Sequence, residues 1–183
     1  FTESNVSFLV WTTTPWTLVS NVAVAVHPEL TYALVSLNGK TVIAAEALLA
    51  VLEKKLNASL TVIKTFPGKT LEGITLEHPF ITRQAPVVLA QFVSKEEGSG
   101  CVHIAPGHGE EDFSLTRHYE LPVIMPVNDK GIFDEPEDFR GKTIPQANEL
   151  VLAKLTHNDA IVSQGKMLHS YPHCWRCKNA VIF

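Results

Sequence analysis

Short segments rich in branched and apolar residues recur along the chain, and most of them alternate with polar residues in the way that is typical of β-strands. Asn38 and Gly39 lie between two such segments, and this pair favours the tight turn of a β-hairpin. The predicted strands are residues 6–10, 21–26, 32–37, 40–45, 60–66, 87–93 and 101–104, with a further candidate at 123–127.

Two segments change to a helical period. Residues 46–56 place four leucines on one helical face, and Asn57 is a typical stop signal. Residues 146–155 show a second amphipathic pattern that starts near Pro145. A third helix is expected from residue 110, after two glycines, because three acidic residues fill its first turn. Strands mixed with a few helices indicate an antiparallel or mixed sheet that closes on itself.

Length, charge and cysteine content narrow the class of protein. The chain has 183 residues, 45% of them hydrophobic, which is enough for one substantial core and one domain. A net charge of −4 argues against a broad basic surface for nucleic acid, so any RNA contact is expected to be local. Three cysteines do not make a secreted disulfide framework, and no segment is typical of a signal peptide or membrane span. We expect a cytoplasmic protein, and a piece of a longer one.

Residues 11–17 read Trp-Thr-Thr-Thr-Pro-Trp-Thr and bring four hydroxyls, two indoles and a proline into seven positions. Pro15 has no N–H and favours an extended conformation of the residue before it, so sheet pairing is expected to end there. The threonines would then lie at a strand end and form the wall of a site. The alternative is an ordinary strand, because threonine is common in β-sheets.

A second motif, residues 98–113, reads Gly-Ser-Gly-Cys-Val-His-Ile-Ala-Pro-Gly-His-Gly-Glu-Glu-Asp-Phe. With the first motif it resembles the editing (CP1) domain of isoleucyl-tRNA synthetase, a class I synthetase, over nearly the whole chain. The resemblance implies a β-rich α+β fold with a closed or nearly closed β-barrel core decorated with helices. It implies one editing domain over residues 1–183, inserted into the catalytic domain of a synthetase and ending in an exit segment at 171–183.

The same resemblance implies hydrolytic proofreading. Valine that is wrongly joined to AMP or to tRNA(Ile) would be released by hydrolysis, without a cofactor for editing. The expected partners are the 3′ end of aminoacylated tRNA(Ile), valine, valyl-adenylate and the rest of the parent synthetase. We expect a monomer with no membrane contact.

The resemblance carries four residues onto the editing pocket. Thr14 would position the attacking water or the ester oxygen, with Thr12 and Thr13 as supporting hydroxyls. Asp112 would bind the substrate's α-ammonium, and His103 would limit the size of the side-chain pocket. Trp16 would be a flat wall against the valine methyls or the adenine. As plain alternatives, Asp112 stabilises a helix N-terminus, His103 is a core residue, and Trp11 belongs to the core.

No serine or cysteine nucleophile with an attendant base is evident, since Cys101 lies in a segment that predicts burial. Direct attack by water is therefore expected, helped by oriented dipoles and by the substrate's ribose hydroxyl, with His108 as an alternative base. A rival hypothesis is a metal-dependent hydrolase that uses His103, His108 and Asp112. Another is a catalytically silent module that only docks tRNA.

The pattern His173-Cys174-x-x-Cys177 is half of a zinc-ribbon motif. The resemblance implies that the other ligands lie upstream in the parent enzyme. Zinc is therefore possible in the full-length parent, and we expect this chain to bind it weakly or not at all.

Overall fold

The computed structural model of the chain describes residues 5–165, 172–178, 181 and 182. Its named strands form two four-stranded sheets, ordered β1-β4-β3-β5 and β6-β7-β2-β8. The strands are β1 (Val6–Phe8), β2 (Ala23–Val26), β3 (Thr31–Leu37), β4 (Lys40–Ala45), β5 (Thr61–Pro67), β6 (Thr75–Glu77), β7 (Gln84–Leu89) and β8 (Cys101–Ile104).

The first sheet is built on the predicted hairpin. β3 and β4 pair antiparallel with Leu37 opposite Lys40, and Asn38 and Gly39 both have positive φ, as a two-residue hairpin turn requires. β1 adds to β4 in parallel, and β5 adds to β3 antiparallel. The prediction of the turn and of its two flanking strands is confirmed.

The second sheet carries part of the candidate site. Its central strand, β2, is buried along its whole length and pairs in parallel with β7 and antiparallel with β8. In this register His103 lies opposite Val24. The strand expected at 87–93 begins earlier, at Gln84, and ends at Leu89, and the segment before it contains a further strand, β6.

The expected closed barrel is wrong. In each sheet of the described structure the outermost strands, β1 and β5 or β6 and β8, have only one neighbour, so neither sheet closes. The physical reason is that consecutive strands along the chain are divided between the two sheets. β1 belongs to the first, β2 to the second, β3–β5 to the first and β6–β8 to the second. Packing of apolar side chains therefore joins the sheets, with β2, β3 and β4 contributing to one core.

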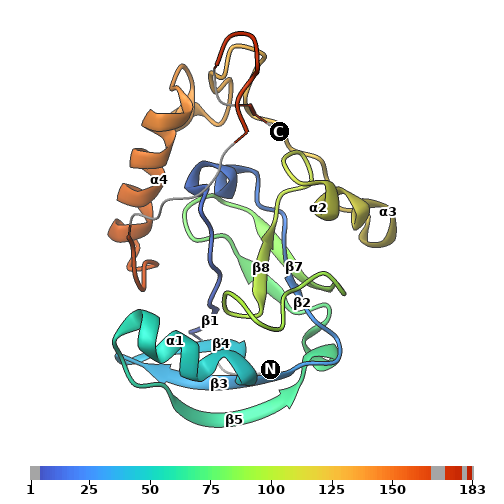
Figure 1. Cartoon of the computed structure of the whole chain (residues 1–183), viewed down its shortest axis with the longest axis vertical. Coiled ribbons are helices and arrows are strands. Elements are labelled where there is room, and N and C mark those ends of the chain that lie inside the picture. The colour runs from blue at the N-terminus through green and yellow to red at the C-terminus, as the bar shows by residue number, and fades with distance from the viewer. Residues whose placement is uncertain (1–4, 166–171, 179–180, 183) are drawn as a thin grey trace.

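The helices lie around these sheets, as Figure 1 shows: α1 lies on the first sheet, α4 on one side of the second and α2 and α3 on the other. They are α1 (Leu49–Leu56), α2 (Glu110–Ser114), α3 (Thr116–Tyr119) and α4 (Ile144–His157), with 3-10 helices η1 (Pro15–Ser20), η2 (Glu46–Leu48), η3 (Gly68–Leu71) and η4 (Glu137–Phe139). Asn57, in the left-handed conformation, ends α1 as expected.

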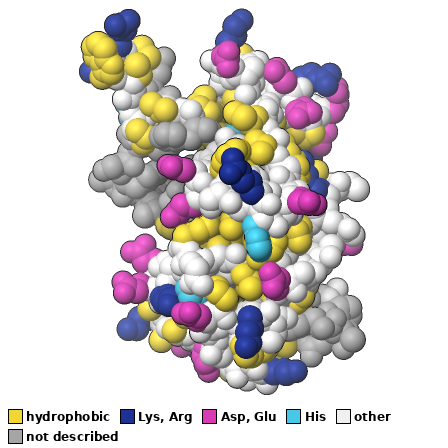
Figure 2. Space-filling model, turned by 90° about the vertical axis from the view of Figure 1, so that its right-hand side faces the viewer, with side chains coloured by type: hydrophobic (Ala, Val, Ile, Leu, Met, Phe, Trp, Pro, Cys, Tyr) yellow, Lys and Arg dark blue, Asp and Glu magenta, His cyan; other side chains and the backbone are white. Residues whose placement is uncertain are grey.

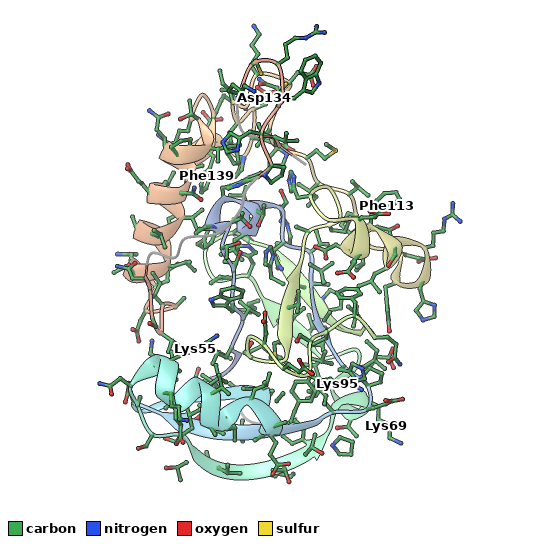
Figure 3. The ribbon with its side chains drawn as sticks, in the orientation of Figure 1. Lys55, Lys69, Lys95, Phe113, Asp134 and Phe139 are labelled. Carbon is green, nitrogen blue, oxygen red and sulfur yellow. The ribbon has the colours of Figure 1, made fainter. Side chains whose placement is uncertain are left out.

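The helix α4 packs on η1 through an apolar cluster of its own. Trp16 and Val19 of η1 meet Ala147 and Val151 of α4 there, together with Phe139, which Figure 3 shows beside α4. The candidate strand at 123–127 is not a strand in the structure, where only a bridge joins Val127 to Phe133. Among the described residues no helix has the length and apolar character needed to cross a membrane.

Candidate active site

The three consecutive threonines lie outside any strand, in the link between β1 and η1. Pro15 opens η1, as proline commonly does at the first position of a helix. The hydroxyl oxygen of Thr12 accepts the Thr14 N–H at 3.0 Å, and the hydroxyl oxygens of Thr12 and Thr14 lie 3.4 Å apart. The alternative of an ordinary strand for these residues is therefore wrong.

Thr17 links the threonine segment to β8. Its hydroxyl donates to the carbonyl oxygen of Thr14 at 2.8 Å, and its oxygen lies 3.2 Å from Nε2 of His103. Since the single proton of Thr17 is used toward Thr14, Nε2 of His103 must carry the proton in their shared hydrogen bond. Nδ1 is then an acceptor.

His103 is held as a neutral ring. Its Nδ1 is buried and has no hydrogen-bond partner in the described part of the chain. Burial lowers the pKa of His103 to about 4, and the nearby imidazoles of His78 and His108 act in the same direction. A second proton on this ring would point an N–H into surroundings that offer no acceptor.

Asp112 lies in the first turn of α2, as expected. Its Oδ2 accepts the backbone N–H of Ala105 at 2.8 Å, which fixes the carboxyl group beneath the glycine loop. Burial raises the pKa of Asp112, and the hydrogen bond from Ala105 offsets this only in part. A Cβ at Gly109 would come within 3.0 Å of the carboxyl carbon, so this glycine leaves room for the carboxylate.

One cavity of about 390 Å³ brings these groups together. It lies between the threonine segment, β8 with the loop before it, and the start of α2. The predicted residues that line it are Thr12, Thr13, Thr14, His103 and Asp112. Five of the six candidate site residues thus share one cavity, although they come from positions as far apart as 12 and 112.

Trp16 is the exception. It does not line the cavity but lies in the core at 4% exposure, where its ring packs edge-on against His108 and Phe133. The expectation of a tryptophan wall came from the resemblance to the editing domain, and an extended segment would allow it because positions 14 and 16 would share one face. In the 3-10 helix, positions 14 and 17 are neighbours instead, and position 16 points elsewhere.

Trp11 takes the place expected for Trp16. It was expected in the core, yet it is 53% exposed and lines the cavity. Lys55 extends from α1 (Figure 3), and its ammonium nitrogen lies 5.8 Å from the centre of the Trp11 ring. An aromatic face beside a cation is thus available at the open side of the cavity.

Sequence reasoning also passed over Thr17 and gave His108 only as an alternative base, although both line the cavity. His108 contacts the buried hydroxyl of Ser20 at 2.9 Å through Nε2. For Thr17 a signal was available, because a proline at the first helical position puts residue 17 one turn after residue 14.

Cys101 lies at the buried end of β8, where burial raises the pKa of its thiol far above the usual range. A neutral, enclosed thiol is a poor nucleophile. This agrees with the expectation that the site does not use a cysteine.

Among the described residues, no group of three or more His, Cys, Asp or Glu side chains is placed to hold a metal ion. In the half-motif at 173–177, hydrogen bonds from the backbone of Cys177 and Arg176 lower the pKa of Cys174, which suits a thiolate ligand. Two thiols supply half of the four ligands that structural zinc prefers, so a zinc site completed by the parent enzyme stays a prediction. Part of the exit segment 171–183 lies outside the described residues.

Comparison with known proteins identifies the fold and the family. A family profile described as "Leucyl-tRNA synthetase, editing domain" matches residues 1–169. The chain belongs to this family of editing domains. The predicted resemblance to a synthetase editing domain is thereby confirmed.

Relatives with similar sequences are isoleucine–tRNA ligases. The chain is 47% identical over 183 residues to the ligase of Petrotoga mobilis and 45% identical over 176 residues to the ligase of Fervidobacterium pennivorans. It is 44% identical over 185 residues to that of Staphylococcus aureus strain Newman. These matches cover 99%, 96% and 99% of this chain but only 20%, 19% and 20% of the relatives. The chain therefore spans about a fifth of their length.

Solved structures of editing domains share the fold. The crystal structure of GlLeuRS-CP1 matches with a TM-score of 0.69 at 17% identity, over 92% of this chain and 86% of that one. The editing domain of the cytosolic leucyl-tRNA synthetase of P. knowlesi matches with a TM-score of 0.64 at 11% identity, over 84% and 82%. The mixed α+β arrangement is thus that of synthetase editing domains.

Proposed function

We propose that this editing domain hydrolyses the ester bond of valine wrongly attached to tRNA(Ile), and the mixed anhydride of valyl-adenylate. The observation that carries the proposal is the shared cavity, in which a fixed carboxylate, a hydroxyl segment and a neutral imidazole surround a space of about 390 Å³. A small amino acid offers an ammonium, an acyl carbonyl and a short side chain for these three walls.

Asp112 is the proposed anchor for the α-ammonium. Among the described residues no Lys or Arg forms a salt bridge with the Asp112 carboxyl, and burial raises its pKa although the nearby His108 acts in the opposite direction. An incoming ammonium would restore the charged form through a short, charge-assisted hydrogen bond. The plain alternative, stabilisation of a helix N-terminus, fits Glu110 and Glu111 equally well and explains nothing about the contact between Asp112 and Ala105.

His103 is the proposed size limit. A hydrophobic pocket separates ligands that differ by one methylene by only about 1–3 kcal/mol, for which valine and isoleucine on this synthetase are the standard example. A second site must therefore admit valine and exclude isoleucine. The ring of His103 suits this task because its hydrogen bond to Thr17 and its place on β8 opposite Val24 keep it from moving aside for a larger substrate side chain.

Thr14 is the proposed positioning group for water or for the ester oxygen. An alcohol does not ionise near neutral pH, so the threonine orients the reaction by hydrogen bonding and does not remove a proton. Water attacks the acyl carbon, the ester C–O bond breaks, and the ribose oxygen leaves with a proton. The neighbouring ribose hydroxyl of the substrate is the proposed route for that proton.

The RNA contact is proposed to be local, at the 3′ end. Figure 2 shows one face of the molecule on which Lys and Arg side chains stand among acidic ones and form no continuous basic surface. This fits the net charge of −4. The exposed face of Trp11 with Lys55 beside it can accept the terminal nucleotide by stacking.

The decisive experiment is deacylation of valyl-tRNA(Ile) by the purified protein. The wild-type protein is expected to hydrolyse it, and Thr14→Ala and Asp112→Ala are expected to lose most of this activity. Thr65, an exposed threonine of β5, gives a matched control, and Thr65→Ala should act like wild type. No hydrolysis by the wild-type protein would favour the silent docking module, and loss of activity with a chelator would favour the metal-dependent hydrolase.

A further inference from the structure

The helix η1 is buried, and much of its backbone is satisfied by side chains from distant parts of the chain. Residues 16–20 are all buried. A buried backbone N–H or C=O needs a partner, and short helices leave such groups open at both ends. The source of these partners therefore decides how firmly the threonine segment is held.

The far end of η1 is fixed by the link between β6 and β7. Nε2 of His78 binds the carbonyl oxygen of Leu18 at 2.8 Å, and Nη1 of Arg83 donates to the carbonyl oxygens of Val19 and Asn21 at 2.9 and 2.8 Å. Nδ1 of His78 accepts the N–H groups of Phe80 and Ile81, which leaves the proton on Nε2.

The near end is fixed by α4. Pro15 has no N–H, so the first free donor of η1 is the N–H of Trp16, and it donates to Oδ1 of Asn148 at 2.9 Å. A helix of this kind is normally capped by the side chain of the residue before it. Thr14 occupies that position, yet its side chain makes no capping hydrogen bond.

Asn148 thus performs the task that Thr14 would otherwise perform. Because the N–H of Trp16 is already occupied, the Thr14 hydroxyl makes no hydrogen bond to the backbone of η1. It lies instead 3.4 Å from the hydroxyl oxygens of Thr12 and Thr17, within the lining of the cavity.

We propose that Asn148 is a positioning residue of the active site, which caps η1 in place of Thr14 and so keeps the Thr14 hydroxyl available for hydrolysis. Without the amide oxygen, the Thr14 hydroxyl, which lies at the N-cap position of η1, is free to accept the N–H of Trp16 and would then turn away from the substrate. The inference rests on the proposed hydrolysis, in which Thr14 takes part.

The test compares variants at position 148 in valyl-tRNA(Ile) deacylation. Asn148→Ala and Asn148→Leu both remove the acceptor, and the leucine keeps the shape of the side chain, so at least one folded variant is expected. Each should lower kcat about 10- to 100-fold, as misplacement of a reacting group does, with KM changed less than about twofold. Asn148→Asp keeps an acceptor oxygen and should retain most of kcat. Glu149→Ala, at the exposed neighbouring position, is the control.

A double variant separates positioning from general weakening of the fold. If Asn148 acts through Thr14, adding Asn148→Leu to Thr14→Ala should lower kcat no further. The inference would be overturned if the losses of kcat from the two substitutions multiplied in the double variant. It would also be overturned if Asn148→Ala and Asn148→Leu both kept the kcat of an active wild type.

If the wild-type protein shows no hydrolysis, the proposed function fails, while hydrogen exchange at the Trp16 amide still tests the cap. Its protection should fall in Asn148→Leu and persist in Asn148→Asp, and equal protection in both would refute it.

Discussion

Nε2 of His103 and the hydroxyl oxygen of Thr17 lie 3.2 Å apart, and this contact joins β8 to the helix that follows the threonine segment. The direction of the bond fixes the tautomer, because Thr17 donates its own proton to Thr14. One hydrogen-bonded chain thus connects the proposed size limit with the proposed water-positioning residue.

The pH dependence of stability should report the buried imidazole. Burial lowers the pKa of His103 from 6.5 to about 4, so between these values the unfolded chain binds more protons than the folded one. Neutral His103 contributes up to about 3 kcal/mol to the free energy of unfolding. This contribution is complete above pH 6.5 and is lost as the pH falls toward 4. Urea unfolding of wild type and His103→Gln at pH 7 and pH 4.5 measures this. The wild-type free energy of unfolding should fall more than that of the variant, and equal losses would contradict it.

Replacement of His103 by alanine should relax the size limit. The space released can hold the extra methylene, so isoleucyl-tRNA(Ile) should become a substrate and the preference for valine should fall at least about tenfold. Parallel deacylation assays with both charged tRNAs measure this. His118→Ala removes an exposed histidine of α3 and serves as the control. A His103→Ala protein that still spares isoleucine would show that the ring does not set the limit.

The charge of Asp112 should matter only to substrates that carry an ammonium. Asp112→Asn keeps an acceptor for the Ala105 N–H but removes the charge, and KM for a valyl ester should rise about tenfold or more. The corresponding ester of the 2-hydroxy acid, which lacks the amine, should be hydrolysed equally by wild type and variant. Glu110→Gln, in the same helical turn, is the control. A uniform loss on both esters would indicate a structural role.

Gly100 should tolerate no side chain. It has a φ of +75°, and a Cβ there would overlap the Cβ of Ala45. Gly100→Ala is expected to lower the free energy of unfolding by about 3 kcal/mol. Gly98 has a φ of +76° with open space around it, so Gly98→Ala measures the backbone strain alone. The urea midpoint of Gly100→Ala should lie clearly below that of Gly98→Ala. Coinciding midpoints would show that the structure around Ala45 shifts to make room for the added Cβ.

Local signals in the sequence predicted many of the strands, turns and helix ends of the fold. Asn38 and Gly39 placed a hairpin, and Asn57 ended α1, because the φ angles that such positions require are readily adopted by few residue types. The number of sheets was not predicted. Periodicity shows which face of a strand is buried but not which strand it pairs with, and β1 and β2 belong to different sheets although they are consecutive strands in the sequence.

The candidate site was predictable where a motif is compact. Thr14, His103 and Asp112 lie within two short motifs, and the cavity unites them. Trp16 does not line the cavity, because in a 3-10 helix positions 14 and 17 lie on one face and position 16 points elsewhere. Asn148 could not be found in this way, since 132 positions separate it from the amide that it binds.

The loop before β8 touches the first sheet through its backbone: Ser99 accepts the N–H of Ala45 at 2.8 Å and donates its hydroxyl to the carbonyl of Leu9, while Gly100 lies against Ala45. The wall of the cavity that Ser99 and Gly100 form is therefore fixed largely by contacts with backbone atoms of Leu9 and Ala45. A cavity wall that is held in this way does not loosen gradually. Its fidelity toward a single methylene should persist with rising temperature until the two sheets separate, so that accuracy and fold are lost in the same transition.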